Sequence, residues 1–280
     1  MDLLDGDGQS ANGYIATYDP ATSRITRLRF ENFRGDFSVP GMDVVPSANP
    51  GELYVYMVNH RAPVGQDSHI IGADSVIEVF KTTAGEERLH HVTTVKDPTI
   101  LTPNNARFSD TLSPGTTVGY CHLDHGYKLV ASKLLTSNGI SSASIDTVYV
   151  ASTLDGKITV FKKQVDNFLL LTDVTHIGQV LDNLVLDSQG SLWAAVFSKA
   201  LDAFQQIVKN TSHITPTAGF RTSTDTGSDG SGYKVEKAEP GPKPRYAKFN
   251  FFLQVFENDG TISSGSTSII YDAEKESYYS

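Results

Sequence analysis

The feature that most constrains the fold is a recurrence of short strand-like runs that are led by aromatic residues. Such runs begin near Tyr14, Tyr54, Tyr149 and Trp193, at intervals of about 40, 95 and 44 residues. The middle interval is close to twice the other two, so a further unit is expected between them. The runs at Tyr54 and Tyr149 are each followed by a second run of similar composition, VIEVFKTT and KITVFKKQ. This period is typical of folds that repeat a small β-unit.

Most other apolar runs of the chain also have the features of strands. They are rich in β-branched and aromatic residues and bounded by Gly, Pro, Asp and Asn, whereas runs with helical spacing are almost absent. Together with weaker units near 100–130 and 246–271, the repeat predicts an all-β fold, a six-bladed β-propeller that forms a single domain over residues 1–280. The predicted strands are 13–19, 25–30, 52–59, 76–80, 89–95, 146–153, 157–163, 169–174, 191–196 and 251–256.

Two segments do not fit this repeat. Residues 221–246 are dense in Ser, Thr, Gly and Pro and have no apolar period, which predicts a long, flexible surface loop. The segment between Phe108 and Thr117 is too short to supply the strands that a full blade needs there. We therefore expect part of a blade to be missing at this point.

Composition excludes several classes of function. The chain has 280 residues, is 39% hydrophobic and carries a formal net charge of -9, so cations are better ligands for it than nucleic acid. It has no apolar run of membrane-spanning length and no signal-like segment after Met1, so we expect no membrane span and a cytoplasmic protein. The single cysteine, Cys121, cannot form an intramolecular disulfide.

Two metal-binding patterns are matched only in part. The stretch GYCHLDHG places His122, Asp124 and His125 at offsets found in a zinc-hydrolase signature, but Tyr120 occupies the position of the first histidine. We favour a solvated turn there. The Asp-rich start of the chain lacks the glutamate that would complete a calcium loop, and we interpret it as a frayed terminus. The sequence also contains no G-x-S-x-G, H-E-x-x-H or P-loop motif.

The better candidates are polar residues that interrupt or close apolar runs at a similar phase of the repeat. They are Asn138 in TSNGIS, Asp182 and Asn183 in LDNLVLD, and His60 in MVNHRAP. In a propeller, such positions meet at the mouth of the central channel. Amide oxygens with one carboxylate are hard donors of the kind that calcium accepts, and a cation would offset the cost of burying Asp182. The alternative is that these residues only shape turns.

The motifs LYVYMVNHRAP, DSVIEVFK, SNGI, VYVASTLDGKITVFKK, VLDNLVLDSQGSLWAA and SSGSTSIIYD follow one another in an order that resembles the serum paraoxonase/arylesterase family. These proteins are calcium-dependent six-bladed propellers related to the SMP-30/gluconolactonase-like proteins, and fungal-type members are most similar. The resemblance runs from about Gly13 to Tyr271. It implies hydrolysis of a small-molecule ester or lactone, with calcium as the cofactor.

The resemblance also implies roles for individual residues. Asn138, Asp182 and Asn183 match the ligands of the family's catalytic calcium, and His60 matches the second member of a histidine pair. The backbone carbonyl of Met42 matches a ligand of the family's structural calcium.

Several departures from the family pattern weaken the expected activity. Pro40 stands where the family has the first histidine of the pair, and nothing in 108–117 matches the family's Asn-Asp-His segment, which supplies one ligand to each calcium. The family's N-terminal acidic pair and final strand are unmatched too. We therefore expect a propeller that is incomplete at its N- and C-terminal seam, binds calcium weakly and hydrolyses esters poorly. The alternatives are a catalytically inactive propeller that binds a ligand or partner, and a truncated gene product. Family members are often secreted, so a missing N-terminal signal would change the expected location.

Overall fold

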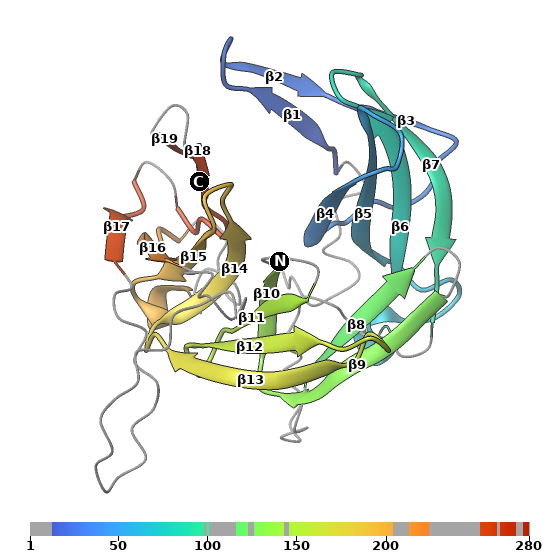
Figure 1. Ribbon diagram of the computed structural model, residues 1–280. Helices are drawn as coiled ribbons and strands as arrows, with labels where there is room; N and C mark the ends of the chain where they lie inside the picture. Colours follow the sequence, from blue (N-terminus) through green and yellow to red (C-terminus); the bar gives the residue numbers. More distant parts are fainter. Residues whose placement is uncertain are drawn as a thin grey trace, which may run out of the picture. The chain divides into compact units, whose positions relative to one another are not determined.

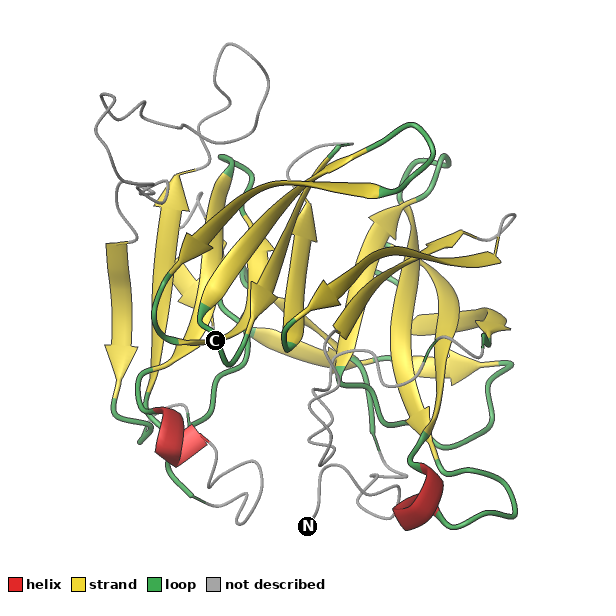
Figure 2. Ribbon diagram, turned by 90° about the horizontal axis from the view of Figure 1, so that it is seen from below, coloured by secondary structure: helices red, strands yellow, loops and turns green. Residues whose placement is uncertain are grey.

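Strands make up nearly all of the regular structure in the computed structural model (Figure 2). It describes residues 13–97, 100, 116–122, 126–142, 146–203, 213–223, 253–261, 264–272 and 277–279. The helix α1 (Ser68–Ile71) has only four residues, and none of the helical segments in these ranges is long and apolar enough to cross a membrane. The prediction of an all-β chain is confirmed.

The chain divides into two compact units, one of residues 1–107 with 121–127 and one of residues 108–120 with 128–280. The first unit contains a five-stranded sheet in the order β3-β7-β6-β5-β4, and β1 and β2 form a separate hairpin (Figure 1). The strands are β1 (Ala16–Asp19), β2 (Arg24–Arg27), β3 (Arg29–Glu31), β4 (Gly41–Pro46), β5 (Glu52–Arg61), β6 (Asp74–Thr83) and β7 (Arg88–Val95).

In the first unit, β4 to β7 form an antiparallel meander and β3 joins its outer strand β7 in parallel. The core of this unit gathers Leu28, Phe37, Val55, Met57, Phe80 and Leu89.

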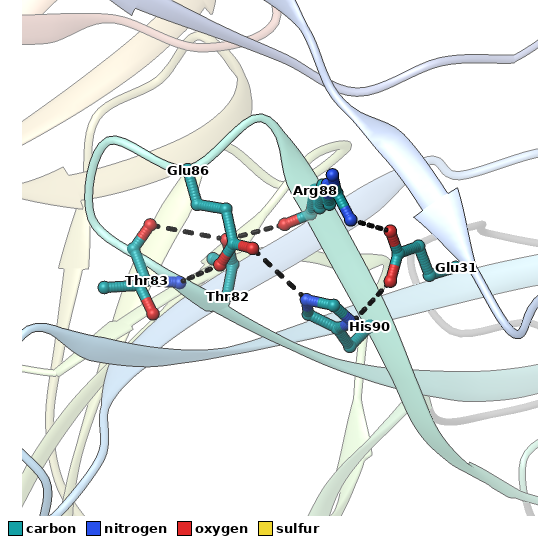
Figure 3. Close-up of polar contacts among 6 residues, drawn as sticks. All are labelled: Glu31, Thr82, Thr83, Glu86, Arg88 and His90. Carbon is teal, nitrogen blue, oxygen red and sulfur yellow. Dashed lines mark hydrogen bonds and ion pairs between the residues drawn. The ribbon is translucent and has the colours of Figure 1, made fainter.

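Side chains reinforce the pairing of β3 with β7. The carboxylate of Glu31 accepts from Arg88 at 2.7 Å and lies 3.0 Å from Nδ1 of His90. The other ring nitrogen of His90 lies 3.3 Å from Glu86 (Figure 3). These groups are partly exposed, so this ionic network contributes modestly to stability.

Two four-stranded antiparallel meanders make up most of the second unit, β10-β11-β12-β13 and β14-β15-β16-β17 (Figure 1). Two hairpins, β8-β9 and β18-β19, complete the described strands. The bounds are β8 (Thr116–His122), β9 (Gly126–Leu134), β10 (Ser137–Ser142), β11 (Thr147–Ser152), β12 (Lys157–Lys163), β13 (Leu169–His176), β14 (Val180–Leu186), β15 (Ser191–Phe197), β16 (Thr217–Ser223), β17 (Leu253–Asn258), β18 (Ile270–Asp272) and β19 (Ser277–Tyr279).

The sheet β10–β13 is covered on both faces. On one face Tyr149 and Ala151 of β11 pack with residues of β14 and β15, and on the other face Val150 packs against Val118 and Val130 of the β8–β9 hairpin. Successive side chains of a strand point to opposite faces, so β11 must be apolar at every central position. Blades of a propeller are covered on both faces in the same way.

The aromatic repeat predicts equivalent strands correctly in three of four cases. Tyr54, Tyr149 and Trp193 lie on β5, β11 and β15, each the second strand of a four-stranded meander. Tyr14 instead precedes β1, so its assignment to an equivalent strand is wrong. Among the described strands, β1 pairs only with β2, and it is exposed along most of its length.

Other predictions of fold stay open. The number of blades, the closing of the ring and the single-domain organisation remain predictions. The predicted loop at 221–246 begins too early, because Arg221 to Ser223 belong to β16, and its residues beyond Ser223 lie outside the described part of the chain. The same holds for residues 108–115 of the segment between Phe108 and Thr117, where part of a blade is predicted to be missing.

Candidate metal centre

The first element of the candidate site is a β-bulge in β10. Ser137 pairs with Ser152 and Ile140 pairs with Val150, so Asn138 and Gly139 together face one residue of β11. A bulge adds a residue to one strand and re-aims the side chains beside it, and such features are frequent next to functional sites. The side chain of Asn138 therefore does not have to follow the regular alternation between the two faces of the sheet.

The neighbouring sheet has a bulge at the same place. In β14, Leu181 pairs with Val196 and Leu184 pairs with Ala194, so Asp182 and Asn183 together face one residue of β15. Both bulges interrupt the first strand of a four-stranded sheet. The polar pair Asp182-Asn183, which interrupts an apolar run, therefore forms the two residues of a bulge that face a single residue of the partner strand.

Gly139 brings the two bulges into contact. A Cβ atom at Gly139 would lie 2.5 Å from the carbonyl oxygen of Asp182 and 2.6 Å from Cα of Asn183. No side chain fits at this position without moving the backbone of β14. The glycine of SNGI is thus required by close packing between the strands, although sequence reasoning did not single it out.

The structure joins Asn138 and Asp182 directly. The side-chain amide of Asn138 hydrogen-bonds the carboxyl group of Asp182. Asp182 is 8% exposed. Burial raises the pKa of its carboxyl group from 3.8 to about 7, and the hydrogen bond from Asn138 offsets part of this rise. Burial therefore destabilises the charged form of this carboxyl group.

The carbonyl oxygen of the Asn138 side chain is also buried. Within the described part of the chain, Oδ1 of Asn138 has no hydrogen-bond partner. A buried acceptor without a partner typically costs about 1–3 kcal/mol, so its retention suggests that a ligand or solvent satisfies it. The two bulges thus bring together a buried amide oxygen without a partner in the described chain and a buried carboxyl group.

Asn183 is held from a distant part of the chain. Its backbone N–H and its side-chain Nδ2 both donate to the carbonyl oxygen of Thr267, at 3.1 Å and 3.0 Å. Since Nδ2 is used, Oδ1 of Asn183 is the atom of the amide left to accept a donor or a cation.

His60 and Met42 lie in the first unit, on β5 and β4. The ring of His60 is buried, and its Nδ1 lies 2.9 Å from Oγ of Ser75 on β6. The side chain of Met42 is exposed. That His60 and the carbonyl of Met42 act with residues of the second unit remains a prediction.

No group of three or more His, Cys, Asp or Glu side chains that could hold a metal lies within the described ranges. The partial zinc-like motif is not tested: His122 ends β8, and Asp124 and His125 lie outside those ranges.

Comparison with known proteins supports the resemblance to the arylesterases over part of the chain. The sequence profile of the Arylesterase family matches residues 111–218, which include Asn138, Asp182 and Asn183. The chain is also 26% identical to serum paraoxonase/arylesterase 2 of Rattus norvegicus over 170 residues. That alignment covers 50% of this chain and 44% of the relative. The resemblance to the paraoxonase/arylesterase family is confirmed over this part of the chain.

Two solved structures share only a general likeness with this chain. One is a protein of Bacteroides fragilis described as a candidate 6-phosphogluconolactonase, at 12% identity and a TM-score of 0.44, covering 97% of this chain and 84% of that chain. The other is a protein of unknown function from Desulfotomaculum acetoxidans, at 9% identity and a TM-score of 0.35, covering 78% of both chains.

Proposed function

We propose that this chain is a weak calcium-dependent hydrolase of small-molecule esters or lactones. Asn138, Asp182 and Asn183 are the calcium ligands in this proposal. The observation that carries it is the buried Oδ1 of Asn138, which has no partner among the described residues, beside the buried carboxyl group of Asp182. The resemblance to arylesterases supports the class of reaction.

A hard cation would remove both energetic penalties of this site. The carboxylate of Asp182 would gain an opposite charge in a place where water is excluded, and Oδ1 of Asn138 would gain a partner. Calcium accepts carboxylate, amide and water oxygens in flexible numbers, which fits a site with one carboxylate and two amides. A zinc ion, by contrast, prefers nitrogen and sulfur ligands that this site does not offer.

Each side chain has a distinct role in the proposed reaction. When bound, calcium would polarise the carbonyl group of an ester or lactone and stabilise the negative charge that develops on its oxygen. Asp182 supplies the negative charge of the site, and the two amides supply neutral oxygens that fix its geometry. The bulges place these groups on the first strands of two packed sheets, which limits their movement.

His60 is the proposed general base. If its Nδ1–H donates to Oγ of Ser75, its Nε2 is the atom that accepts a proton from water. Pro40 has no group that transfers protons, so His60 acts without the partner that the family pattern supplies. Low turnover follows from this loss.

Hydrolysis of phenyl acetate and of a simple lactone, with and without a chelator, tests the proposal. We expect slow hydrolysis that the chelator abolishes and that added calcium restores. Asp182→Asn should abolish it, and His60→Gln should lower kcat with little effect on calcium binding. Hydrolysis that is unaffected by the chelator and by Asp182→Asn would contradict the proposal.

Pro40 favours a second candidate, an inactive relative that still binds a ligand through calcium. In that case the chelator would release a bound ester or lactone, but no variant and no substrate would show turnover.

A further inference from the structure

The carbonyl oxygen of Thr267 receives two hydrogen bonds from Asn183, one from the backbone and one from the side chain. A carbonyl oxygen can only accept, so Nδ2 and not Oδ1 of Asn183 must face it. The amide of Asn183 is therefore fixed in one of its two possible orientations by a residue 84 positions away in the sequence.

Thr267 is held firmly enough to impose this orientation. It belongs to residues 264–267, here called the strap. At the start of the strap, Oγ of Ser264 accepts from the backbone N–H of Thr215 at 2.9 Å, and the N–H of Gly265 donates to the carbonyl of Thr215 at 3.2 Å. Thr215 is fully buried.

The chain is also anchored beyond the strap. Ile269 is buried, and the ring of Tyr271 stacks on that of Trp193 with centroids 4.8 Å apart. Trp193 is itself buried in β15 of the same unit. The carbonyl of Thr267 thus lies between two anchored points of one short segment.

We propose that the carbonyl of Thr267 is a positioning group for the calcium site: it fixes the amide of Asn183 so that Oδ1, and not the NH2 group, is offered to the cation. This inference rests on the proposed function. Asn138 is oriented in the same way, because its amide donates to Asp182. In both residues a protein acceptor occupies the NH2 group, so that two amide oxygens remain for the ion.

The variant Asn183→Asp tests whether calcium affinity depends on the positioning of residue 183 by the strap or only on the charge of the ligands. An additional carboxylate should tighten calcium binding if ligand charge alone decides the affinity. If Thr267 positions residue 183, the variant should bind calcium more weakly. Aspartate would place an acceptor oxygen against the carbonyl of Thr267, where Asn183 has a donor. We expect calcium to bind about 10-fold more weakly, the usual effect of disturbing a partner of a metal ligand.

Ser264→Ala loosens the strap without touching a proposed ligand. We expect it to weaken calcium binding by about 10-fold as well, with little change in the melting temperature of the calcium-free protein. Ser188→Ala is the matched control, because Ser188 is exposed in the turn between β14 and β15. Isothermal titration calorimetry with calcium chloride measures the calcium affinity of the wild type and of the three variants.

A second measurement does not depend on calcium. In an NMR spectrum of the calcium-free protein, the side-chain NH2 of Asn183 should exchange slowly with solvent, and Ser264→Ala should speed this exchange. Rapid exchange in the wild-type protein, or tighter calcium binding by Asn183→Asp, would overturn the role of Thr267. Slow exchange in a wild-type protein that binds no calcium would instead overturn the proposed calcium site and, with it, the ligand role of Asn183.

Discussion

At the scale of single residues, Asp182 shows the conflict between stability and function most clearly. Its carboxyl group lies in a bulge among apolar neighbours, where burial raises its pKa to about 7. Between pH 4 and 7, roughly, the folded protein therefore binds a proton more strongly than the unfolded chain does. The contribution of this carboxyl group to the free energy of unfolding is fully present below its pKa in the unfolded chain. It is lost as the pH rises through its pKa in the folded protein.

Asp182→Asn should stabilise the calcium-free protein because it removes a buried charge beside which the described residues place no opposite charge. The gain in free energy of unfolding should be small near pH 4 and grow to on the order of 2–4 kcal/mol at pH 8, from the size of the pKa shift. Urea denaturation of both proteins over this range, with chelator present, measures it.

The same variant should lose any stabilisation by added calcium, since the only carboxylate of the proposed ligand set is gone. A variant that is less stable than the wild type at pH 8 would show that the charge of Asp182 is already compensated within the protein. A variant that still responds to calcium would place the ion elsewhere.

At the scale of elements, the site depends on two bulges that must stay in register with each other. The bulge of β10 meets the bulge of β14 at Gly139, where a side chain would collide with backbone atoms. Behind them, Leu181 and Leu184 anchor β14 in the core that it shares with β11, β12 and β15. The packing of two sheets thus fixes the distance between the two halves of the site.

Gly139→Ala should separate the two halves. The added methyl group must push β14 away, which we expect to cost about 2 kcal/mol or more in stability and to abolish calcium binding. Gly35→Ala is the matched control, because the nearest atom to its added methyl group, in the ring of Phe33, lies 4.0 Å away. Thermal melts and calcium titration of both variants, compared with the wild type, check this prediction. An alanine variant at Gly139 that kept full stability and calcium binding would show that β14 can move freely.

The sequence predicts several covered strands closely but misses the exposed edge strand β4. The predicted strands 52–59, 157–163 and 191–196 agree closely with β5, β12 and β15 because their cores are continuous runs of β-branched, aromatic and other apolar residues. β4 was missed because it is an edge strand whose residues are mostly exposed, so it shows no apolar alternation.

The candidate site was only partly predictable, for a different physical reason. Asn138, Asp182 and Asn183 interrupt apolar runs, and this interruption is visible in the sequence. The bulges themselves are set by the register between strands, and the bond from Asn183 to Thr267 joins positions 84 residues apart. Local patterns carry no information on such contacts.

At the scale of the whole molecule, the two units each have their own core, and the three proposed calcium ligands all belong to the second unit. His60 belongs to the first unit. The alignment with the rat relative spans less than half of that protein. In the proposed function, the calcium ligands therefore come from the second unit alone, and the participation of His60 remains a prediction.

The last prediction is that calcium binds weakly and stabilises the protein only slightly. Calcium prefers six to eight oxygen ligands, and its affinity follows their charge and rigidity. The matched positions offer two amide oxygens and one carboxylate, so water must complete the shell and one negative charge faces a dication. The structural ion of the family has only the carbonyl of Met42 as a matched ligand, so stabilisation by that ion should be largely lost. Calorimetric titration should give a dissociation constant well above the micromolar range, and a chelator should lower the melting temperature only slightly. Micromolar or tighter binding, together with a large drop in melting temperature on chelation, would mean that residues other than the matched ones complete the coordination.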